Sequence, residues 1–285
     1  MEWNRKMTRP LTMLAVVTML FAVNPSYSAQ EGQSSAVETI KGKDGAPMIL
    51  IPAGSFTMGS NDGLPNERPE HKVTLDAYYI DQYEVTIGRY SAFLEAKHHE
   101  SPPTWDEEAA TTVGDRPAVG MRWKDAADYC RSAGKRLPTE AEWENAARGT
   151  DGRRYPWGHM QPFVDIANYN RGVWVSEAIT LVPVDSGLEG MSVRHGLKEG
   201  GKSPYGLMHM AGNAAEWVAD WYDREYYQKS PETNPTGPAN GEKRVIRGGS
   251  WADLPAALRV TARFSADTDF EDRTIGFRCA MTAAK

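Results

Sequence analysis

The chain has 285 residues with a formal net charge of −6, and charged residues make up 25% of it. This acidic balance argues against a nucleic-acid partner, which would need a basic face to neutralise phosphates. The 26 glycines, 18 prolines, 9 tryptophans and 12 tyrosines are typical of a loop-rich fold held by aromatic clusters. The length fits two ordinary domains or one large irregular domain.

Residues 1–28 predict a secretory signal peptide that is cleaved near Ser28. Basic residues precede an uncharged apolar run at 11–23, and small residues follow at the cleavage position. The run is too short to cross a bilayer as a helix; the alternative is a short anchor that stays uncut. We expect a periplasmic or secreted protein with no membrane span after signal removal, in which residues 29–46 form a flexible leader.

The first predicted elements of the mature chain are strands. Residues 48–51 form an apolar run that ends at a break over 52–54, and a partner strand follows at 55–58. Residues 61–70 are polar and contain prolines and a glycine, which predicts a loop. Alternation over 71–85 indicates a strand or a pair of strands.

Two helices come next. Thr86 is a suitable N-cap, and apolar residues recur with the helical period from there to Lys97. A second helix is predicted over 123–133, with Gly134 as its stop signal.

A third helix begins after Thr139, which has capping-box spacing to Glu142, and runs to Arg148. Residues 151–203 show little periodicity, and a long irregular region of this kind is typically functional or held by ions and side chains. No internal repeat or sharp change in composition divides the chain. We therefore expect one domain over residues 47–285.

Residues 244–263 read as a site that presents side chains. A strand-like run is broken by Gly248 and Gly249, after which Ser250 and Trp251 are followed by an apolar run of helical character.

Only two cysteines are present, Cys130 and Cys279. In an oxidising compartment two distant cysteines most often pair. The alternative is a reactive thiol or a pair of metal thiolates, but neither residue has a neighbouring cysteine or histidine.

A series of short blocks, in order from residue 48 to the C-terminus, resembles the formylglycine-generating-enzyme (sulfatase-modifying factor) family. The blocks are PAGSFTMG at 52–59, YEVT at 83–86, YC at 129–130, GKRLPTEAEWE at 134–144, YPWG at 155–158, YGL at 205–207, GNAAEW at 212–217, DW at 220–221, RGGSW at 247–251 and GFRCA at 276–280.

The resemblance implies a single α+β domain with little regular secondary structure, related to the C-type-lectin type. It also implies structural calcium in the irregular region. Relatives that carry cysteines at the positions of Cys130 and Cys279 join them, which agrees with the pairing expected from the compartment.

Active members of the family hold copper with two cysteines after the Gly-Gly-Ser turn and oxidise a substrate cysteine to an aldehyde with molecular oxygen. Aligned on that turn, the cysteine positions carry Asp253 and Leu258 here. Cu(I) prefers sulfur ligands, which neither side chain supplies. Copper is therefore not expected at the usual position, and Ala215 replaces a tryptophan that relatives place near the substrate cleft.

Ser250 and Trp251 match the family and are candidate catalytic residues together with Asp253. Asp253 could act as a general base or as a hard metal ligand in a cleft. The alternative, which we favour, is an aspartate that caps a turn or helix.

By motif position, the family's calcium ligands correspond to Asn168, Gly212, Ala214 and Glu216, the glycine and alanine through carbonyl oxygens. His209 stands where relatives usually have Asp or Asn and would be a poor ligand. The segment after Asn168 lacks the family's later Asp-Gly donor turn. The alternative for Glu216 is a buried carboxylate bonded to backbone amides.

The six histidines form no metal motif. Four C-terminal arginines could form an anion site, although we expect them to pair with carboxylates. They are Arg259, Arg263, Arg273 and Arg278.

The leading hypothesis is an exported accessory or maturation oxidoreductase that acts on an exported protein or peptide-derived substrate without the copper-dithiol site. Relatives that oxidise pyoverdine precursors in the periplasm also lack the cysteine pair. The second hypothesis is a non-catalytic ligand-binding or assembly factor that uses the lectin-like fold. A third, ordinary formylglycine generation on a sulfatase, is opposed by the residues at 253 and 258. Calcium is the only cofactor we expect; no nucleotide cofactor is implied.

Overall fold

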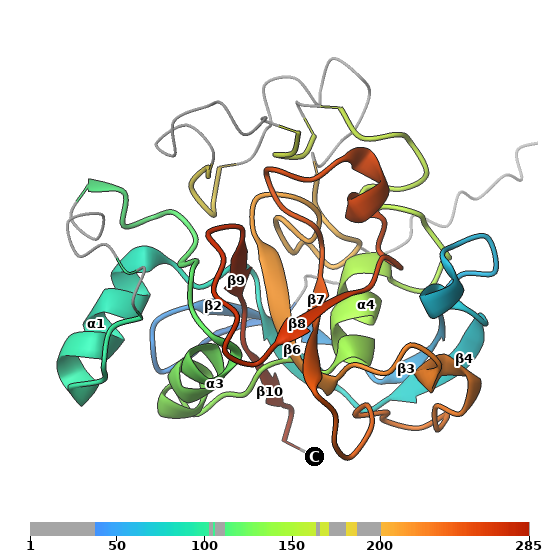
Figure 1. Cartoon of the computed structure of the whole chain (residues 1–285), viewed down its shortest axis with the longest axis horizontal. Helices are drawn as coiled ribbons and strands as arrows, with labels where there is room; N and C mark the ends of the chain where they lie inside the picture. Colours follow the sequence, from blue (N-terminus) through green and yellow to red (C-terminus); the bar gives the residue numbers. More distant parts are fainter. Residues whose placement is uncertain are drawn as a thin grey trace, which may run out of the picture. The chain divides into compact units, whose positions relative to one another are not determined.

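The structure is a computed structural model (Figure 1). It describes residues 38–102, 105, 112–163, 166–170, 181–186 and 201–284. The predicted signal peptide and residues 29–37 of the predicted leader lie outside these ranges. Within the described ranges, no helix is both long and apolar enough to cross a membrane.

In the part of the chain that the structure describes, ten short strands form three sheets. The strands are β1 (Thr39–Lys41), β2 (Pro47–Ile51), β3 (Gly54–Met58), β4 (His71–Leu75), β5 (Tyr78–Asp81), β6 (Ala215–Trp221), β7 (Lys243–Arg247), β8 (Phe264–Asp267), β9 (Ile275–Phe277) and β10 (Ala280–Thr282). The sheet orders are β1-β2-β5-β10, β3-β4 and β8-β7-β6-β9. All the pairs are antiparallel except β6 with β9, which is parallel. Chain ends far apart in sequence thus meet in one sheet.

Within the described ranges, three α-helices and three short 3-10 helices accompany the sheets. They are α1 (Ile87–Lys97), α3 (Trp123–Ser132), α4 (Glu140–Arg148), η1 (Pro65–Glu67), η4 (Tyr226–Gln228) and η5 (Pro255–Leu258). The predicted N-caps are confirmed: the Thr86 hydroxyl accepts from the Arg89 amide, and the Thr139 hydroxyl accepts from the Glu142 amide while the Glu142 carboxylate accepts from the Thr139 amide. Gly134 has the positive φ expected of a helix stop.

The structure differs from the expected elements at two places. Residues Thr39–Lys41 of the predicted leader pair with β2, so the folded region begins before residue 47. The helical run expected after Trp251 is a single 3-10 turn, η5; the backbone is extended at Arg259, and a turn follows in which the Ala262 amide donates to the Arg259 carbonyl. The backbone carbonyls of Val260 and Thr261 accept hydrogen bonds from a buried arginine of β7, which a continuing helix would prevent.

The sheet β8-β7-β6-β9 separates two hydrophobic clusters. Trp217 and Ile246 belong to a cluster with α1, α3 and β9, whereas their neighbours Val218 and Val245 belong to a cluster with β2, β3, β4, β5 and α4. Successive strand residues point to opposite faces, so this sheet is covered on both faces. These observations confirm the expected α+β class with little regular structure.

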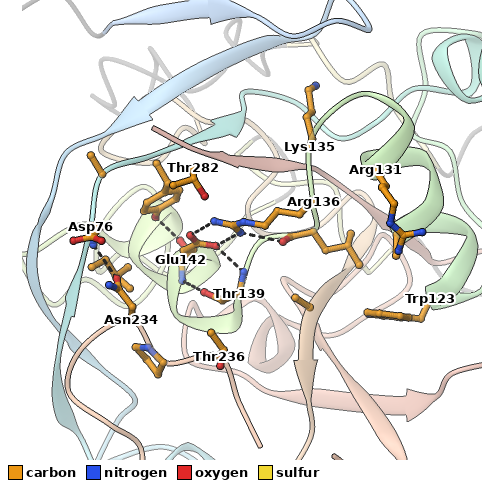
Figure 2. Close-up of a pocket in the computed structure, with 17 residues that line it drawn as sticks. Asp76, Trp123, Arg131, Lys135, Arg136, Thr139, Glu142, Asn234, Thr236 and Thr282 are labelled. Carbon is orange, nitrogen blue, oxygen red and sulfur yellow. Dashed lines mark hydrogen bonds and ion pairs between the residues drawn. The ribbon is translucent and has the colours of Figure 1, made fainter. Parts of the chain in front are cut away.

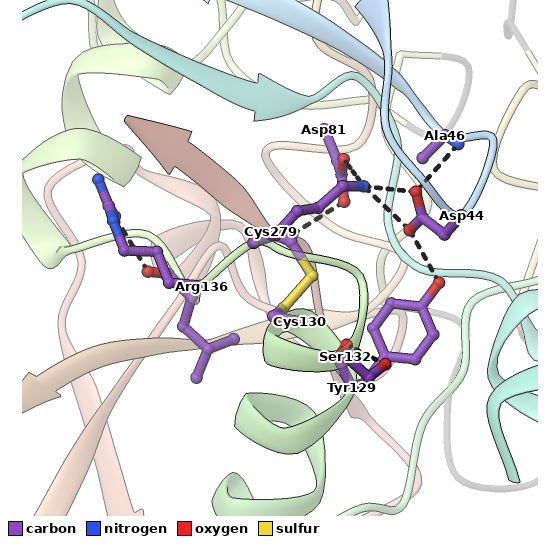
Figure 3. Close-up of a disulfide and its surroundings, with 10 residues drawn as sticks. Asp44, Ala46, Asp81, Tyr129, Cys130, Ser132, Arg136 and Cys279 are labelled. Atoms are coloured by element: carbon purple, nitrogen blue, oxygen red, sulfur yellow. Dashed lines mark hydrogen bonds and ion pairs between the residues drawn. A yellow bond between two sulfur atoms is a disulfide. The ribbon is translucent and has the colours of Figure 1, made fainter. Parts of the chain in front are cut away.

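The predicted disulfide is confirmed, because Cys130 of α3 is joined to Cys279, which precedes β10 (Figure 3). Both residues are fully buried. Beside the disulfide, the buried Lys135 ammonium lies 2.7 Å from Asp44 and 2.7 Å from Asp81. Burial raises the pKa of Asp81 to about 6. The disulfide joins α3 to the residue before β10, and Lys135, just after α3, links the β1–β2 turn to the end of β5.

Replacing both cysteines by alanine should destabilise the protein strongly. The bond closes a loop with a sequence separation of 149. Without it the unfolded chain gains conformational entropy, and the free energy of unfolding falls by about 5 kcal/mol in the chain-entropy model. Urea denaturation of the oxidised wild type and the Cys130→Ala/Cys279→Ala variant measures this difference. A loss below about 1 kcal/mol would contradict a stabilising role for the bond.

Candidate functional site

The Gly-Gly turn after β7 requires both of its glycines. Gly248 and Gly249 have φ values of +90° and +66°, in the left-handed region. A Cβ atom on Gly248 would lie 3.1 Å from a ring carbon of Trp143, and one on Gly249 would lie 3.0 Å from the Ala257 carbonyl oxygen. Conformation and close packing together therefore select glycine.

Arg247 fixes the turn from behind. Its guanidinium is fully buried and donates to Glu144 at 2.5 Å, to Glu140 at 3.2 Å and to the Val260 carbonyl at 2.6 Å. Arg263 donates to the same Glu140 at 2.7 and 2.8 Å. Helix α4 supplies both carboxylates. Ion pairs therefore link the turn to α4, and the hydrogen bond of Arg247 to Val260 links it to the segment after η5.

Asp253 lies at the first cysteine position of the family and closes the turn. Its Oδ2 accepts from the Ser250 amide at 2.8 Å and from the Ser250 hydroxyl at 2.7 Å. The Ser250 hydroxyl also accepts from the Ala252 amide at 3.3 Å. Ser250 is buried while Asp253 is partly exposed. The geometry matches the turn-capping interpretation of Asp253, and it brings together the two polar candidates of the sequence analysis.

Trp251 is attached to the irregular region, since its amide donates to the Asn213 carbonyl at 2.9 Å. Its side chain is half-buried, and within the described residues its indole Nε1 is buried without a hydrogen-bond partner. Leu254, which follows the capping aspartate, is 64% exposed. The turn thus presents an aromatic and an aliphatic side chain beside the Ser250–Asp253 pair.

Leu258, at the second cysteine position, is part of the hydrophobic core. It is fully buried in a cluster with Tyr155, Ile166, Ala167, Tyr169 and Ala211. Both cysteines of the chain are consumed in the disulfide. A carboxylate that caps a turn and a buried leucine do not fit a Cu(I) site, which needs soft sulfur ligands.

Three of the four predicted calcium residues lie together, Asn168 in the irregular region and Gly212 and Ala214 in the segment just before β6. The Asn213 amide donates to the Asn168 carbonyl at 2.8 Å, and the Asn168 side-chain amide donates to Asn213 Oδ1 at 3.0 Å. Gly212 has φ +83°, and a Cβ there would lie 2.4 Å from the Asn168 carbonyl oxygen. Ala214 follows directly in the chain and is buried.

The fourth predicted calcium residue, Glu216, is engaged by the protein itself. Its carboxylate accepts three hydrogen bonds from Arg278 at 2.7 to 3.0 Å and one from the Trp143 indole at 2.7 Å. Four bonds fill the acceptor positions of a carboxylate. The burial expected in the alternative prediction is confirmed, but its predicted partners, backbone amides, are wrong: the donors to Glu216 are a guanidinium and an indole.

Glu84 is a site residue that the sequence analysis did not assign. Its fully buried carboxylate accepts from the Ala214 amide at 2.9 Å and from the Asn213 side chain at 2.8 Å. Burial, and next the charge of Glu216, raise the pKa of Glu84 to about 8. Two carboxylates and one guanidinium, that of Arg278, leave one uncompensated negative charge when both are ionised, which suits a cation. A glutamate inside the otherwise apolar YEVT block was the signal available in the sequence.

His209 adopts φ +53°, a conformation that asparagine also tolerates. Its ring is buried, and within the described residues its Nε2 has no hydrogen-bond partner. Burial, and next the charge of Arg278, lower the pKa of His209 to about 4. The ring is therefore neutral at physiological pH.

The expected pairing of the C-terminal arginines is confirmed for three of them. The pairs are Arg259 with Glu67 at 2.5 Å, Arg263 with Glu140 at 2.7 Å and Arg278 with Glu216 at 2.7 Å. Among the described residues, no group of three or more His, Cys, Asp or Glu side chains could hold a metal ion.

A separate cavity of about 530 Å³ is lined by parts of α3, β4, β5 and the start of α4 (Figure 2). Its basic residues are all paired: Arg136 with Glu142 at 2.6 Å, Lys135 with the two aspartates beside the disulfide, and Arg131 with Asp128 at 2.6 Å. None of the residues of the Gly248–Asp253 turn lines this cavity.

Residues 33–283 match the sulfatase-modifying factor enzyme 1-like domain, so the chain belongs to the formylglycine-generating-enzyme family. It is 32% identical to the formylglycine-generating enzyme of Streptomyces coelicolor, over 92% of this chain and 96% of that protein. It is 30% identical to the formylglycine-generating enzyme of Bos taurus, over 90% and 84%. It is also 30% identical to the inactive C-alpha-formylglycine-generating enzyme 2 of Mus musculus, over 84% and 86%.

Solved structures agree with the fold. PvdO from Pseudomonas aeruginosa superposes with a TM-score of 0.69 at 26% identity, over 86% of this chain and 98% of that chain. Treponema denticola variable protein 1 has a TM-score of 0.66 at 24% identity, over 87% and 99%. The fold is therefore the irregular α+β formylglycine-generating-enzyme fold of the C-type-lectin type, as the sequence blocks implied.

Replacing His209 by Asn should flatten the acid side of the stability profile. The unfolded chain takes up a proton on this side chain near pH 6.5, whereas the folded chain does so only near pH 4. The wild type therefore loses stability as the pH falls through this interval, by up to about 3 kcal/mol. We expect His209→Asn to lose less between pH 7 and pH 4.5 in urea denaturation. An identical pH dependence in the two proteins would contradict a buried neutral imidazole.

Proposed function

We propose that the protein is an exported accessory or maturation oxidoreductase that acts on an exported protein or peptide-derived substrate without the copper-dithiol site. Family membership and the likeness to PvdO support the class of protein. The apolar N-terminal run and a disulfide between the only two cysteines support export.

The observation that carries the proposal is the fate of the two cysteine positions. Asp253 closes the turn with two hydrogen bonds to Ser250, and Leu258 is fully buried. The turn is preserved while the soft-metal ligands are gone. The residues available for work at this turn are Ser250, Asp253 and the half-buried Trp251, of which Asp253 is the group that can hold or accept a proton.

A second candidate function is a non-catalytic binding or assembly role. One carboxylate oxygen of Asp253 is already hydrogen-bonded to Ser250 within the turn. Leu254, near Trp251 in the chain, is 64% exposed, which suits contact with a partner. A relative named as inactive within the same family makes this role consistent with the fold.

Copper binding separates the proposed chemistry from ordinary formylglycine generation. We expect the purified mature protein to bind no stoichiometric Cu(I) in a competition assay with a colorimetric chelator. The Asp253→Cys/Leu258→Cys variant supplies two thiols and should gain one Cu(I), whereas each single variant should not. Stoichiometric Cu(I) in the wild type would overturn the assignment.

Oxygen uptake in the presence of the exported protein fraction of the source cells separates the oxidoreductase from the binding role. We expect uptake by the wild type that falls by at least about tenfold in Asp253→Ala, since a positioned acid or base contributes at least this much. Asp272→Ala, a partly buried aspartate that closes a different turn, is the matched control and should keep the activity. Binding of a partner without oxygen uptake would favour the second candidate.

We also propose that calcium binds where Asn168 and the carbonyls of Gly212 and Ala214 gather, with Glu84 as the carboxylate ligand. Two buried carboxylates, Glu84 and Glu216, share the single guanidinium of Arg278, and this supports a cation there, because a bound cation would favour the ionised form of Glu84, whose pKa is otherwise raised to about 8. Calcium should raise the melting temperature above that measured in EDTA by about 3 °C or more, and Glu84→Gln should abolish the shift. An equal rise with magnesium, or none with calcium, would contradict this site without affecting the copper result.

A further inference from the structure

A groove of about 420 Å³ lies between α1 and α3, formed by none of the residues of the Gly248–Asp253 turn. Helix α1 provides one wall, α3 provides the other, and the turn between β1 and β2 closes one end. The lining residues are Lys43, Asp44, Gly88, Arg89, Ala92, Phe93, Ala96, Lys97, Tyr129, Ser132 and Ala133.

The groove has apolar and small side chains along its length. Gly88, Ala92 and Ala96 are spaced four residues apart and therefore share one face of α1. The rings of Phe93 and Tyr129 meet edge to face with centroids 5.5 Å apart. The small side chains of α1 leave room beside the two aromatic rings for an aliphatic or aromatic ligand group.

The only carboxylate in the lining is already neutralised. Asp44 accepts from the Lys135 ammonium at 2.7 and 2.9 Å and from the Tyr129 hydroxyl at 2.9 Å (Figure 3). The same hydrogen bond satisfies the polar end of Tyr129. What Asp44 and Tyr129 contribute to the groove is therefore neither net charge nor a free hydroxyl.

Three cations remain at the groove. Lys43 lies over the end of α3, with its Nζ 3.3 Å from the position of a Cβ on Gly134. Arg89 and Lys97 lie eight positions apart on α1, so they follow the same helix face. Among the described residues, none of these three side chains is within ion-pair distance of a carboxylate. The groove is locally basic on a chain whose net charge is −6.

We infer that the α1–α3 groove binds a small amphiphilic anion, a carboxylate with an acyl or aromatic body. Three surface cations, of which Lys43 and Lys97 are exposed and Arg89 is half-buried, would alone indicate only a solvated surface. Here they border a concavity of ligand size that is lined mainly by small or apolar side chains, and opposite charge at the rim of an apolar groove selects a ligand with both properties. A free amphiphile fits the groove's volume, whereas a flat membrane surface would not fill a concavity between two helices.

Isothermal titration with dodecanoate tests the inference on the full mature protein. We expect saturable one-to-one binding of dodecanoate below its micellar concentration. Dodecanol, which lacks the charge, and acetate, which lacks the body, should each bind at least about tenfold more weakly. Equal binding of dodecanol would overturn the role of the cations, and equal binding of acetate would overturn the role of the groove.

Variants locate the binding. Arg89→Gln/Lys97→Gln should weaken dodecanoate binding about tenfold, and Ala92→Trp, which fills the groove from an exposed helix position, should abolish it. Lys229→Gln, at a lysine paired with Asp223, is the matched control and should bind as the wild type. Far-ultraviolet circular dichroism verifies the fold of each variant.

Unchanged binding in Ala92→Trp would place the ligand elsewhere and overturn the inference. Sedimentation with vesicles of phosphatidylglycerol and phosphatidylcholine distinguishes the source of the anion. Retention on anionic vesicles that is lost in Arg89→Gln/Lys97→Gln but kept in Ala92→Trp would replace the free ligand by a membrane surface and so overturn the inference. These outcomes are independent of the copper and oxygen experiments.

Discussion

The conformation of the candidate site depends on a buried charge network behind it. Arg247 ends β7 immediately before the two glycines and is held by Glu140 and Glu144 of α4, with Arg263 on the same Glu140. All four side chains are almost completely buried. Removing one partner of such a group leaves an uncompensated charge in the core, which costs several kcal/mol. The network therefore fixes the strand, the helix and the turn relative to one another as one unit.

Features that depend on local sequence could be predicted. The caps at Thr86 and Thr139 follow from a hydroxyl and its amide a few residues later, and the stop at Gly134 follows from one left-handed residue. The disulfide followed from the compartment and the cysteine count, without knowledge of geometry. The capping role favoured for Asp253 is also local, because its partner Ser250 is three residues away.

Features that depend on distant partners could not be predicted. Glu84 and Ala214 are 130 residues apart, and Glu67 and Arg259 are 192 apart, so no window of sequence contains both groups. At η5 the local sequence gives a wrong prediction because a distant contact decides the structure. Its composition favours a longer helix, but carbonyls beyond it are required by Arg247, and that tertiary demand overrides local preference.

The contacts that fix the Gly-Gly turn are separate from the side chains that the turn presents, so its conformation does not require cysteines. Nothing that fixes Gly248 and Gly249 involves a thiol: the positive φ values, the contact with Trp143 and the charge network all lie on the core side. At position 258 a leucine joins an existing hydrophobic cluster, where its buried side chain contributes about 2 kcal/mol rather than binding a metal. At position 253 the aspartate closes the turn through two hydrogen bonds to Ser250. Because the two glycines are fixed from the core side, the side chains that the turn presents can differ while its backbone conformation is kept.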